Sequence, residues 1–249
     1  GEKSINDQAN QSKKPWSLLE YLITYRKREI SAQELISLIW GDDDSSNPNG
    51  ALKTLLFRSR KLLAPLDYPT HELIIQQRGS YAWNPNLTTV VDADEFESLC
   101  NKGNHPKTSD KEKLSYFLRA LDLYKGDFLP KSEWESWVVP ISTYYHSLYQ
   151  QTVHKTIELL STMDKWSQVI DICQRAITIE PFDEEFHYDL IYALYKNGDQ
   201  HGALEHYAHT TSLFYDEFAI TPSSLLKDLY KLIRDEKHGI TTDISTIQE

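Results

Sequence analysis

Apolar residues recur at helical spacing in three successive segments near the beginning of the chain. The first, "PWSLLEYLITYRKR", starts with Pro15, which suits the first turn of a helix because that position needs no amide hydrogen. The spacing predicts one buried face on this helix, made of Trp16, Leu19, Leu22 and Ile23.

The second segment, "SAQELISLIW", has the polar signature of a helix start followed by an apolar stripe. Ser31 and Glu34 stand at capping-box spacing, at which each side chain reaches the backbone amide of the other residue. Gly41 is expected to end the helix. The predicted buried face consists of Leu35, Ile36, Ile39 and Trp40.

The third segment, "NGALKTLLFRSRKLL", separates its residues into an apolar stripe and a basic face. The stripe, with small Ser59 filling a gap in it, consists of Leu52, Leu55, Leu56, Leu62 and Leu63. The remaining positions are expected to face outward, and they are Lys53, Thr54, Phe57, Arg58, Arg60 and Lys61.

The run "ELIIQQRGSYAW" contains two short β-prone stretches around Arg78 and Gly79, which predicts a hairpin. Three helices followed by a hairpin outline a winged helix-turn-helix. Its third helix would enter the major groove of DNA, and Arg60 and Arg78, the latter at the hairpin tip, would chiefly meet phosphate or the minor groove. Tyr81 is expected to support the wing.

Each of these features has a simpler interpretation. A cationic helix face is most often a solvated surface, and only the order of helices, caps and hairpin favours DNA. Phe57 either contacts a thymine methyl group or packs beneath the wing, and the sequence leaves both open.

Charge divides the chain in the same place as the hydrophobic pattern. The net charge is −11, yet residues 13–86 carry ten Lys and Arg against eight Asp and Glu, which leaves −12 for residues 87–249. No apolar run is long enough for a membrane span or a signal core, and Cys100 and Cys173 make no disulfide framework. The sequence therefore predicts a cytoplasmic protein that does not associate with membranes.

The second part of the chain is almost wholly helical in its pattern. Ser109 with Glu112, and Ser132 with Glu135, both have capping-box spacing. A long helix is expected from "EWESW" to "LLSTM", with Pro140 as a kink or break inside it.

Two stretches in this part align at a spacing of 35 residues, so that Val169 matches Leu204 and Ile172 matches Tyr207. A further helix lies between them, and a helix pair of about this period is typical of tetratricopeptide repeats. Thr221 is expected to cap the last helix, with Pro222 at its first position.

The segments "LISLIWGDDD", "NGALKTLLFRSRKLL" and "LIIQQRGSYAW" resemble the winged-helix domain of OmpR-type regulators. They are most similar to the version in the Streptomyces antibiotic regulatory protein (SARP) family. "LDLYKGDFLP" and "FAITPSSLLKDLY" are similar to stretches of its bacterial transcriptional activation domain.

The resemblance implies a recognition helix with Arg58, Arg60 and Lys61 on its basic positions. Phe57 and Ser59 replace the usual Ser and Leu, so no base preference carries over. It also implies contact between RNA polymerase and the loop that holds Asp42, Asp43 and Asp44, for which an acidic solvated loop is the alternative. Family members begin with a small antiparallel sheet, of which residues 1–14 would be a truncated remnant.

Other chemistry finds little support. His201, Glu205 and His209 recur every four residues, with His206 nearby, but no zinc motif contains them. No phosphate-binding glycine motif and no nucleophile elbow is present, so neither an enzyme nor a cofactor is predicted.

The sequence as a whole predicts a mainly α protein. A winged helix-turn-helix with a short β-hairpin wing spans residues 15–92, a TPR-like helical domain spans 93–237, and 238–249 form a disordered tail. The predicted function is sequence-specific binding of double-stranded DNA in transcriptional activation, by a homodimer on repeated half-sites or together with RNA polymerase. The alternative is a TPR-type adaptor whose winged helix does not bind DNA.

Overall fold

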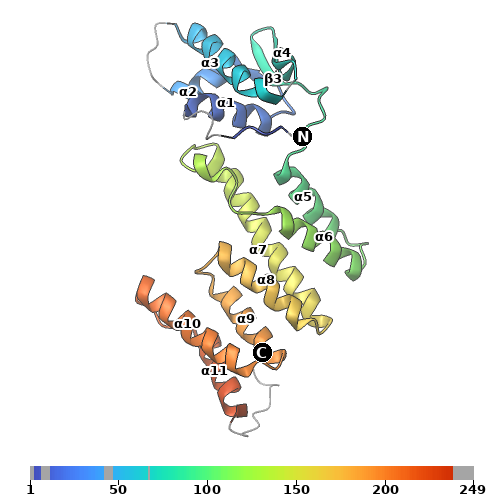
Figure 1. Cartoon of the computed structure of the whole chain (residues 1–249), viewed down its shortest axis with the longest axis vertical. Coiled ribbons are helices and arrows are strands. Elements are labelled where there is room, and N and C mark those ends of the chain that lie inside the picture. Colours follow the sequence, from blue (N-terminus) through green and yellow to red (C-terminus); the bar gives the residue numbers. More distant parts are fainter. Residues whose placement is uncertain (1–2, 7–11, 42–46, 67, 238–249) are drawn as a thin grey trace. The chain divides into compact units, whose positions relative to one another are not determined.

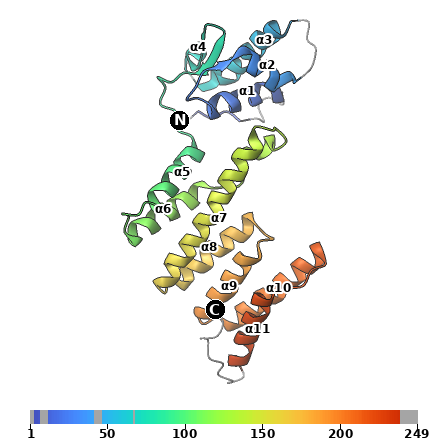
Figure 2. The same ribbon diagram turned by 180° about the vertical axis from the view of Figure 1, so that it is seen from behind.

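The computed structural model describes residues 3–6, 12–41, 47–66 and 68–237. Of Lys237 it describes the backbone and not the side chain. The chain divides into two compact units, Gly1–Thr89 and Val90–Glu249. Figures 1 and 2 show the first as helices with a small sheet and the second as helices alone. The expected disordered tail, residues 238–249, lies outside the described residues.

The described part of the first unit contains helices and one small antiparallel sheet. Its elements are α1 (Lys13–Thr24), β1 (Ile30–Ser31), α2 (Ala32–Trp40), α3 (Pro48–Leu63), the 3-10 turn η2 (Ala64–Leu66), α4 (Thr70–Leu73), β2 (Ile74–Gln77) and β3 (Ser80–Trp83). The strands lie in the order β1-β3-β2. This arrangement of three helices and a hairpin matches the predicted winged helix.

The predicted hairpin is present, and its turn consists of Arg78 and Gly79 alone. Gln77 pairs with Ser80 across this turn. Both turn residues have positive φ, 47° and 86°, as a two-residue type I′ turn requires. The amide of Ala32 donates to the Gly79 carbonyl at 3.0 Å, which ties the turn to the start of α2.

Strand β1 was not predicted, because two residues are too short for a period-2 pattern to be visible. It pairs with β3 through Ile30 opposite Tyr81. Residues 3–6, expected as part of a sheet remnant, form no strand.

The apolar faces of α1 and α2 differ in detail from the prediction. Trp16 and Ile23 are only half-buried, and the buried residues of α1 are Pro15, Leu18, Leu19, Tyr21 and Leu22. In α2 only Leu35 is fully buried. A helix packed between neighbours on two sides buries a face that period counting alone places imperfectly.

The first capping box is only half formed. The amide of Glu34 donates to Ser31 Oγ at 3.1 Å, as predicted. The Glu34 carboxylate instead accepts from Arg28 and from the Tyr21 hydroxyl. A cation and a buried phenol therefore replace the backbone amide as its partners. Gly41 ends α2 with a φ of 60°, as predicted.

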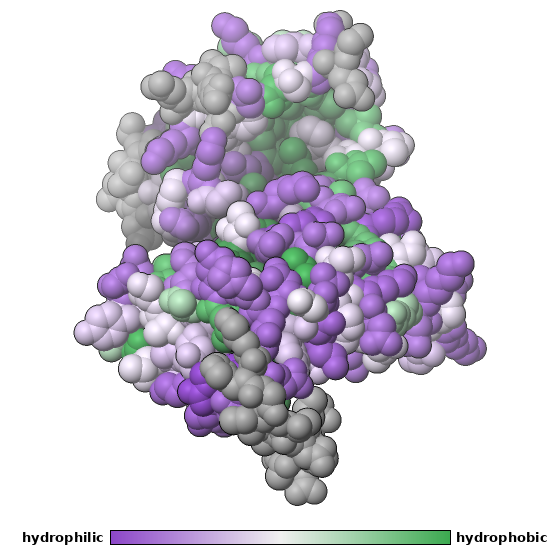
Figure 3. Space-filling view, turned by 60° about the horizontal axis from the view of Figure 1, so that its bottom comes forward, coloured by the Kyte–Doolittle hydropathy of each residue, from purple (hydrophilic) through white to green (hydrophobic). Residues whose placement is uncertain are grey.

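The second unit is an array of helices joined by short connections. They are α5 (Asp92–Gly103), α6 (Asp110–Leu123), the 3-10 turn η3 (Pro130–Ser132), α7 (Val138–Thr162), α8 (Trp166–Ile179), α9 (Glu184–Lys196), α10 (Gln200–Phe218) and α11 (Ser224–Lys237). One core cluster runs from α5 to α9 and another joins α9, α10 and α11. Hydrophilic residues cover most of the face shown in Figure 3.

Gly103, at the end of α5, allows a close approach between α5 and α6. A Cβ atom placed there would lie 2.3 Å from the Phe117 ring of α6. Only glycine fits this approach without displacing a buried ring.

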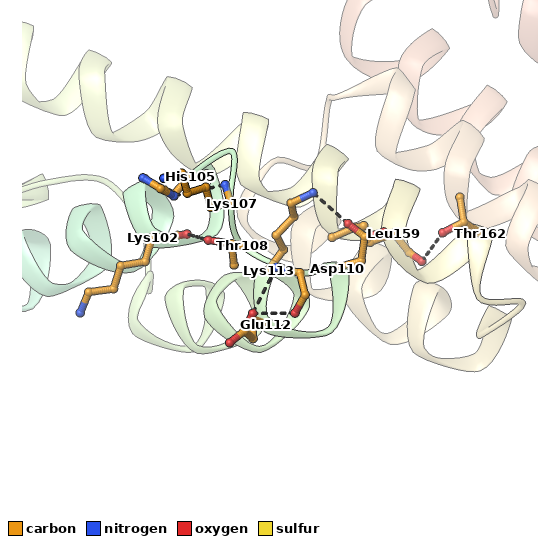
Figure 4. A network of polar contacts seen from close by, with 10 residues as sticks. Lys102, His105, Lys107, Thr108, Asp110, Glu112, Lys113, Leu159 and Thr162 are labelled. Carbon is orange, nitrogen blue, oxygen red and sulfur yellow. Dashed lines mark hydrogen bonds and ion pairs between the residues drawn. The ribbon is translucent and has the colours of Figure 1, made fainter.

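The capping predictions of the second unit have mixed outcomes. The Ser109 and Glu112 box is complete at the start of α6, where Thr108 also donates to the Lys102 carbonyl (Figure 4). The box predicted at Ser132 and Glu135 is wrong, because Ser132 ends a 3-10 turn and α7 begins only at Val138. Pro140 therefore lies in the first turn of α7, where proline breaks no helical hydrogen bond, and it is not a kink.

The helical repeat is present with a spacing of 34 residues and not 35. Helices α8 and α10 begin at Trp166 and Gln200, 200 − 166 = 34 residues apart. At this spacing Val169 corresponds to Ala203 and Ala176 corresponds to Thr210, and all four residues are buried. The N-cap of α11 is Ser223 and not Thr221, since Ser223 Oγ accepts from the amide of Leu226 at 3.3 Å.

Candidate nucleic-acid interface

Helix α3 has two faces of opposite character. The buried face matches the prediction except for Leu62, which is half-buried, and consists of Leu52, Leu55, Leu56, Ser59 and Leu63. The outward residues that are fully exposed are Lys53, Thr54, Phe57, Arg58 and Lys61. At about 100° per residue, the centres of the two sets lie roughly half a turn apart around the helix.

Four cations of the first unit have no partner among the described residues. Lys53, Arg58 and Lys61 on α3 and Arg78 at the wing tip are exposed and make no hydrogen bond or ion pair there. Lys53, Phe57 and Lys61 follow one another at four-residue spacing, so they form a single row along the helix. The outward face of α3 is thus positively charged and open to an external anion.

Phe57 lies in the middle of this basic row with 68% of its surface exposed. The interpretation that it packs beneath the wing is therefore wrong. The exposed Thr54 nearby donates its hydroxyl to the Gly50 carbonyl at 3.0 Å.

Arg60 is only partly exposed, so the prediction that it belongs to the exposed face of α3 is wrong, while its contact with DNA stays a prediction. Its Nη2 atom donates to the carbonyl of Ile74 in β2 at 2.7 Å, and its Nε atom is buried with no hydrogen-bond partner. The guanidinium therefore connects α3 to strand β2 of the wing. The helical spacing of the sequence could have predicted this partial burial, because Arg60 lies at the border between the apolar stripe and the exposed face.

Tyr81 is not an exposed DNA-contacting residue, since only 4% of its surface is accessible. It lies in the central strand β3, between Ile30 of β1 and Gln76 of β2. The expectation that it supports the wing agrees with this position. At the base of the wing, Trp83 Nε1 donates to Thr89 Oγ1 at 2.8 Å.

Ser59 connects the third helix to the first, a role that was predicted only as filling a gap. Its surface is fully buried, and its hydroxyl lies 3.3 Å from the Pro15 carbonyl and 3.1 Å from the Leu55 carbonyl. A leucine at this position would remove this hydrogen bond between α3 and α1.

A polar network that the sequence analysis missed holds α1 against α2. The Tyr21 hydroxyl donates to Glu34 Oε1 at 2.7 Å, and Arg28 Nη1 donates to Glu34 Oε2 at 3.0 Å. Burial and the neighbouring carboxylate raise the pKa of Tyr21 to about 12, while Arg28 lowers the pKa of Glu34. The Arg28 cation is thus engaged inside the unit and is not part of the outward basic face.

The histidines of the second unit make a buried contact and no metal site. His187 Nε2 donates to the Pro181 carbonyl at 2.9 Å, and His187 Nδ1 lies 3.0 Å from His206 Nε2. Burial lowers the pKa of His187, and burial with the two neighbouring histidines lowers that of His206 to about 4. His201 and His209 are exposed, and the described residues contain no group of three potential ligands able to hold a metal ion.

Three further predictions concern the acidic loop, the two cysteines and membrane spans. Asp42, Asp43 and Asp44 are outside the described residues. Cys100 and Cys173 are buried free thiols, and burial raises the pKa of each. None of the helices in the described part of the chain is long and apolar enough to cross a membrane.

Comparison with known proteins supports the architecture of a winged helix followed by a helical domain. The bacterial transcriptional activator domain family matches residues 91–234, more than half of the chain. The chain therefore belongs to this family. With its winged helix ahead of this domain, the chain has the domain order of the SARP family, and the relatives to which it is similar are named regulatory proteins.

The relatives differ in length from this chain. Regulatory protein AfsR of Streptomyces coelicolor is 24% identical over 222 residues, which cover 87% of this chain but 21% of AfsR. The chain thus spans about a fifth of that relative. Transcriptional regulatory protein MoaR1 of Mycobacterium tuberculosis is 20% identical over 224 residues, covering 88% of this chain and 71% of MoaR1.

A solved structure has the same fold. It is that of Mycobacterium tuberculosis EmbR in complex with a low-affinity phosphopeptide, with a TM-score of 0.57 and 18% sequence identity. The match covers 93% of this chain and 61% of EmbR. At this identity the likeness concerns the fold alone.

Proposed function

We propose that this regulator binds double-stranded DNA through α3 and the wing and activates transcription. The observation that carries the proposal is the row of cations on α3 that has no partner in the described part of its own chain. A DNA duplex offers a phosphate charge about every 1.7 Å of its axis, which such a row would neutralise. DNA binding would extend over the domain expected at residues 15–92.

The shape of α3 supports this proposal. A helix with its side chains is about 10–12 Å across, and the major groove is about 12 Å wide. In that position Lys53, Arg58 and Lys61 contact phosphate or guanine edges, and Phe57 contacts a thymine methyl group. Arg78 at the wing tip reaches the adjacent phosphates or the minor groove.

A single winged helix makes few contacts, so tight binding requires a second module or a second partner. We infer that two copies bind repeated half-sites, or that RNA polymerase supplies the additional contacts through the loop holding Asp42, Asp43 and Asp44. The acidic helical domain, expected at 93–237, would then mediate self-association or regulation and would not touch the phosphates. Like charge keeps it from the duplex.

The test measures the affinity of the full chain for duplex DNA by fluorescence anisotropy at several salt concentrations. Each phosphate contact contributes about 0.9 to the slope of log K against log salt. Arg58→Ala and Lys61→Ala are each expected to weaken binding and to reduce this slope by about one. Arg78→Asn is the matched variant in the wing, because asparagine tolerates the positive φ of that turn while removing the charge.

Lys107→Ala, which removes an exposed cation of the helical unit, serves as the control and should leave affinity and slope unchanged. A parent chain that binds duplex with no salt dependence would contradict the electrostatic proposal. If Lys107→Ala weakens DNA binding as much as Arg58→Ala does, the DNA contact would lie in the helical unit, against the proposal. Selection of bound sites from random duplexes then identifies the operator.

A further inference from the structure

A cleft in the helical unit opens beside the end of α6 and the facing sides of α7 and α8. Its volume is about 250 Å³. The residues that line it are Leu121, Tyr124, Lys125, Tyr149, Val153, Ile172, Arg175, Thr178 and Ile179. The cleft lies wholly within one unit, far in sequence from the outward face of α3.

The wall of the cleft is mainly apolar and aromatic. The rings of Tyr124 and Tyr149 stack with their centroids 4.1 Å apart and their planes at 11°. Val153 and Ile172 are buried beside them. Such a wall favours the apolar body of a ligand, in the manner of small-molecule sites generally.

One polar group on this wall has no partner. Tyr149 is 3% exposed, and its hydroxyl makes no hydrogen bond with the described residues. The hydroxyl of the stacked Tyr124 instead donates to Asp127 Oδ1 at 3.1 Å. The Tyr149 hydroxyl is not among the side-chain atoms of the described residues that are buried without a partner, so it remains accessible from the cleft to an acceptor on a ligand.

The formal charges of the lining are both positive, although residues 87–249 carry a net charge of −12. Arg175 is held at the cleft by Asp122 at 3.0 Å and by the Leu121 carbonyl at 3.1 Å. Lys125 is exposed and makes no ion pair with the described residues. Lys125 and Arg175, together with the Tyr149 hydroxyl, could therefore bind a carboxylate group.

The carboxylates near the cleft contact groups other than Lys125. Asp122 pairs with Arg175, while Glu180 and Asp127 share one neighbour and lie 3.3 Å and 3.1 Å from His146 Nδ1. Lys125 therefore has no counter-ion among the described residues.

We propose that this cleft binds a small carboxylate with an apolar body, such as a single-ring aromatic acid. The ring lies against Tyr149, Val153 and Ile172, while the carboxylate accepts from the Tyr149 hydroxyl and meets Lys125 and Arg175. The volume sets the size of the ligand, because a dry cavity of about 150 Å³ already holds benzene. A cleft of 250 Å³ has room for one ring with a short acidic side chain.

The test compares three probes of nearly equal size on the full chain: phenylacetate, 2-phenylethanol and 2-phenylethylamine. Binding is measured by ligand-observed NMR and equilibrium dialysis. Phenylacetate is expected to bind at least about fivefold more tightly than the alcohol, since its carboxylate makes charge-assisted hydrogen bonds. The amine is expected to bind most weakly of the three.

Variants then locate the site. Tyr149→Phe keeps the stacked ring and removes the hydroxyl. It is expected to weaken the binding of phenylacetate by about tenfold, which is the equivalent of one hydrogen bond. Lys125→Gln should reduce the preference of the chain for the acid over the alcohol. Ile172→Phe fills the cleft and should abolish binding, whereas Lys113→Gln, on the surface of α6, should change nothing.

The proposal is overturned if phenylacetate does not bind at millimolar concentration or if the amine binds as well as the acid. Binding that survives unchanged in folded Ile172→Phe would likewise place the ligand elsewhere. The comparison of the three probes uses only the parent chain, so it decides the matter even where a variant fails to fold. The outcome is independent of whether the chain binds DNA.

Discussion

The two units of this chain differ in where their unpaired cations lie. In the helical unit Arg175 pairs with Asp122 at 3.0 Å and Lys113 with Asp110 at 2.8 Å, and in the winged unit Arg28 pairs with Glu34. Three cations of α3 and one at the wing tip have no partner among the described residues. Unpaired cations are thus gathered on one helix of the winged unit, whereas the cleft of the helical unit has the single unpaired Lys125.

Buried polar groups connect helices in both units. In the helical unit the Thr152 hydroxyl lies 3.2 Å from Cys100 Sγ of α5, and the Thr210 hydroxyl lies 3.1 Å from His187 Nδ1 of α9. In the winged unit the Ser59 hydroxyl lies 3.3 Å from the Pro15 carbonyl of α1. Buried hydroxyls therefore serve the same purpose in the two units.

The largest expected effect concerns the core of the helical unit. Phe186, at the start of α9, is fully buried, and Phe186→Ala should cost about 3–5 kcal/mol of stability. Hydrogen exchange measured by mass spectrometry should show lost protection in α8, α9 and α10 with little change in α1 and α3. Equal loss in both units would show that they fold as one cooperative body, against the comparison made above.

Acidification is expected to weaken the same unit by the next largest amount. Because the pKa of His206 is about 4 in the folded chain and near 6.5 when unfolded, the unfolded chain binds this proton first. The contribution of neutral His206 to stability is complete above about pH 6.5 and is lost as the pH falls to about 4. The loss at pH 4.5 should be roughly 2–3 kcal/mol.

Denaturant unfolding of the parent and of His206→Gln across this pH range measures the effect. The variant should show a flatter dependence on pH. The other titratable groups near this pair, which remain in the variant, are His187, His209, Asp183 and Glu184. An unchanged pH dependence would assign the effect to those groups.

In the winged unit, Arg60→Gln separates bracing from binding. Losing the bond to the Ile74 carbonyl should cost about 1–3 kcal/mol of stability. DNA affinity should fall by the same factor at every salt concentration, so that the salt slope stays at the parent value. A slope reduced by about 0.9, as expected for Arg58→Ala, would instead place Arg60 on a phosphate.

The smallest effect is expected from the exposed pair of Arg28 and Glu34. Arg28→Ala should destabilise the winged unit by at most about 1 kcal/mol, because water screens an exposed ion pair. Thermal unfolding at low and high salt measures this, and the difference from the parent should shrink as salt rises. A loss of stability larger than about 1 kcal/mol would show that the hydrogen bond between the Tyr21 hydroxyl and Glu34 also depends on Arg28.

Local pattern alone was sufficient for most of the helices, for the hairpin and for the character of α3, but not for strand β1 or the start of α7. The period of its leucines predicted which side is buried, and the turn chemistry of Arg78 and Gly79 predicted the hairpin, because both depend on near neighbours in the chain. The basic outward face followed from the same period. The family resemblance added the order of the two domains.

Contacts between distant residues decided what the pattern left open. Arg60 became a brace only because β2 brings the Ile74 carbonyl to it, and Phe57 became exposed because the wing does not cover it. Likewise Glu34 left its capping box for Arg28 and Tyr21. The partner of a long polar side chain depends on which chain segments pack beside it, and only the tertiary structure determines that.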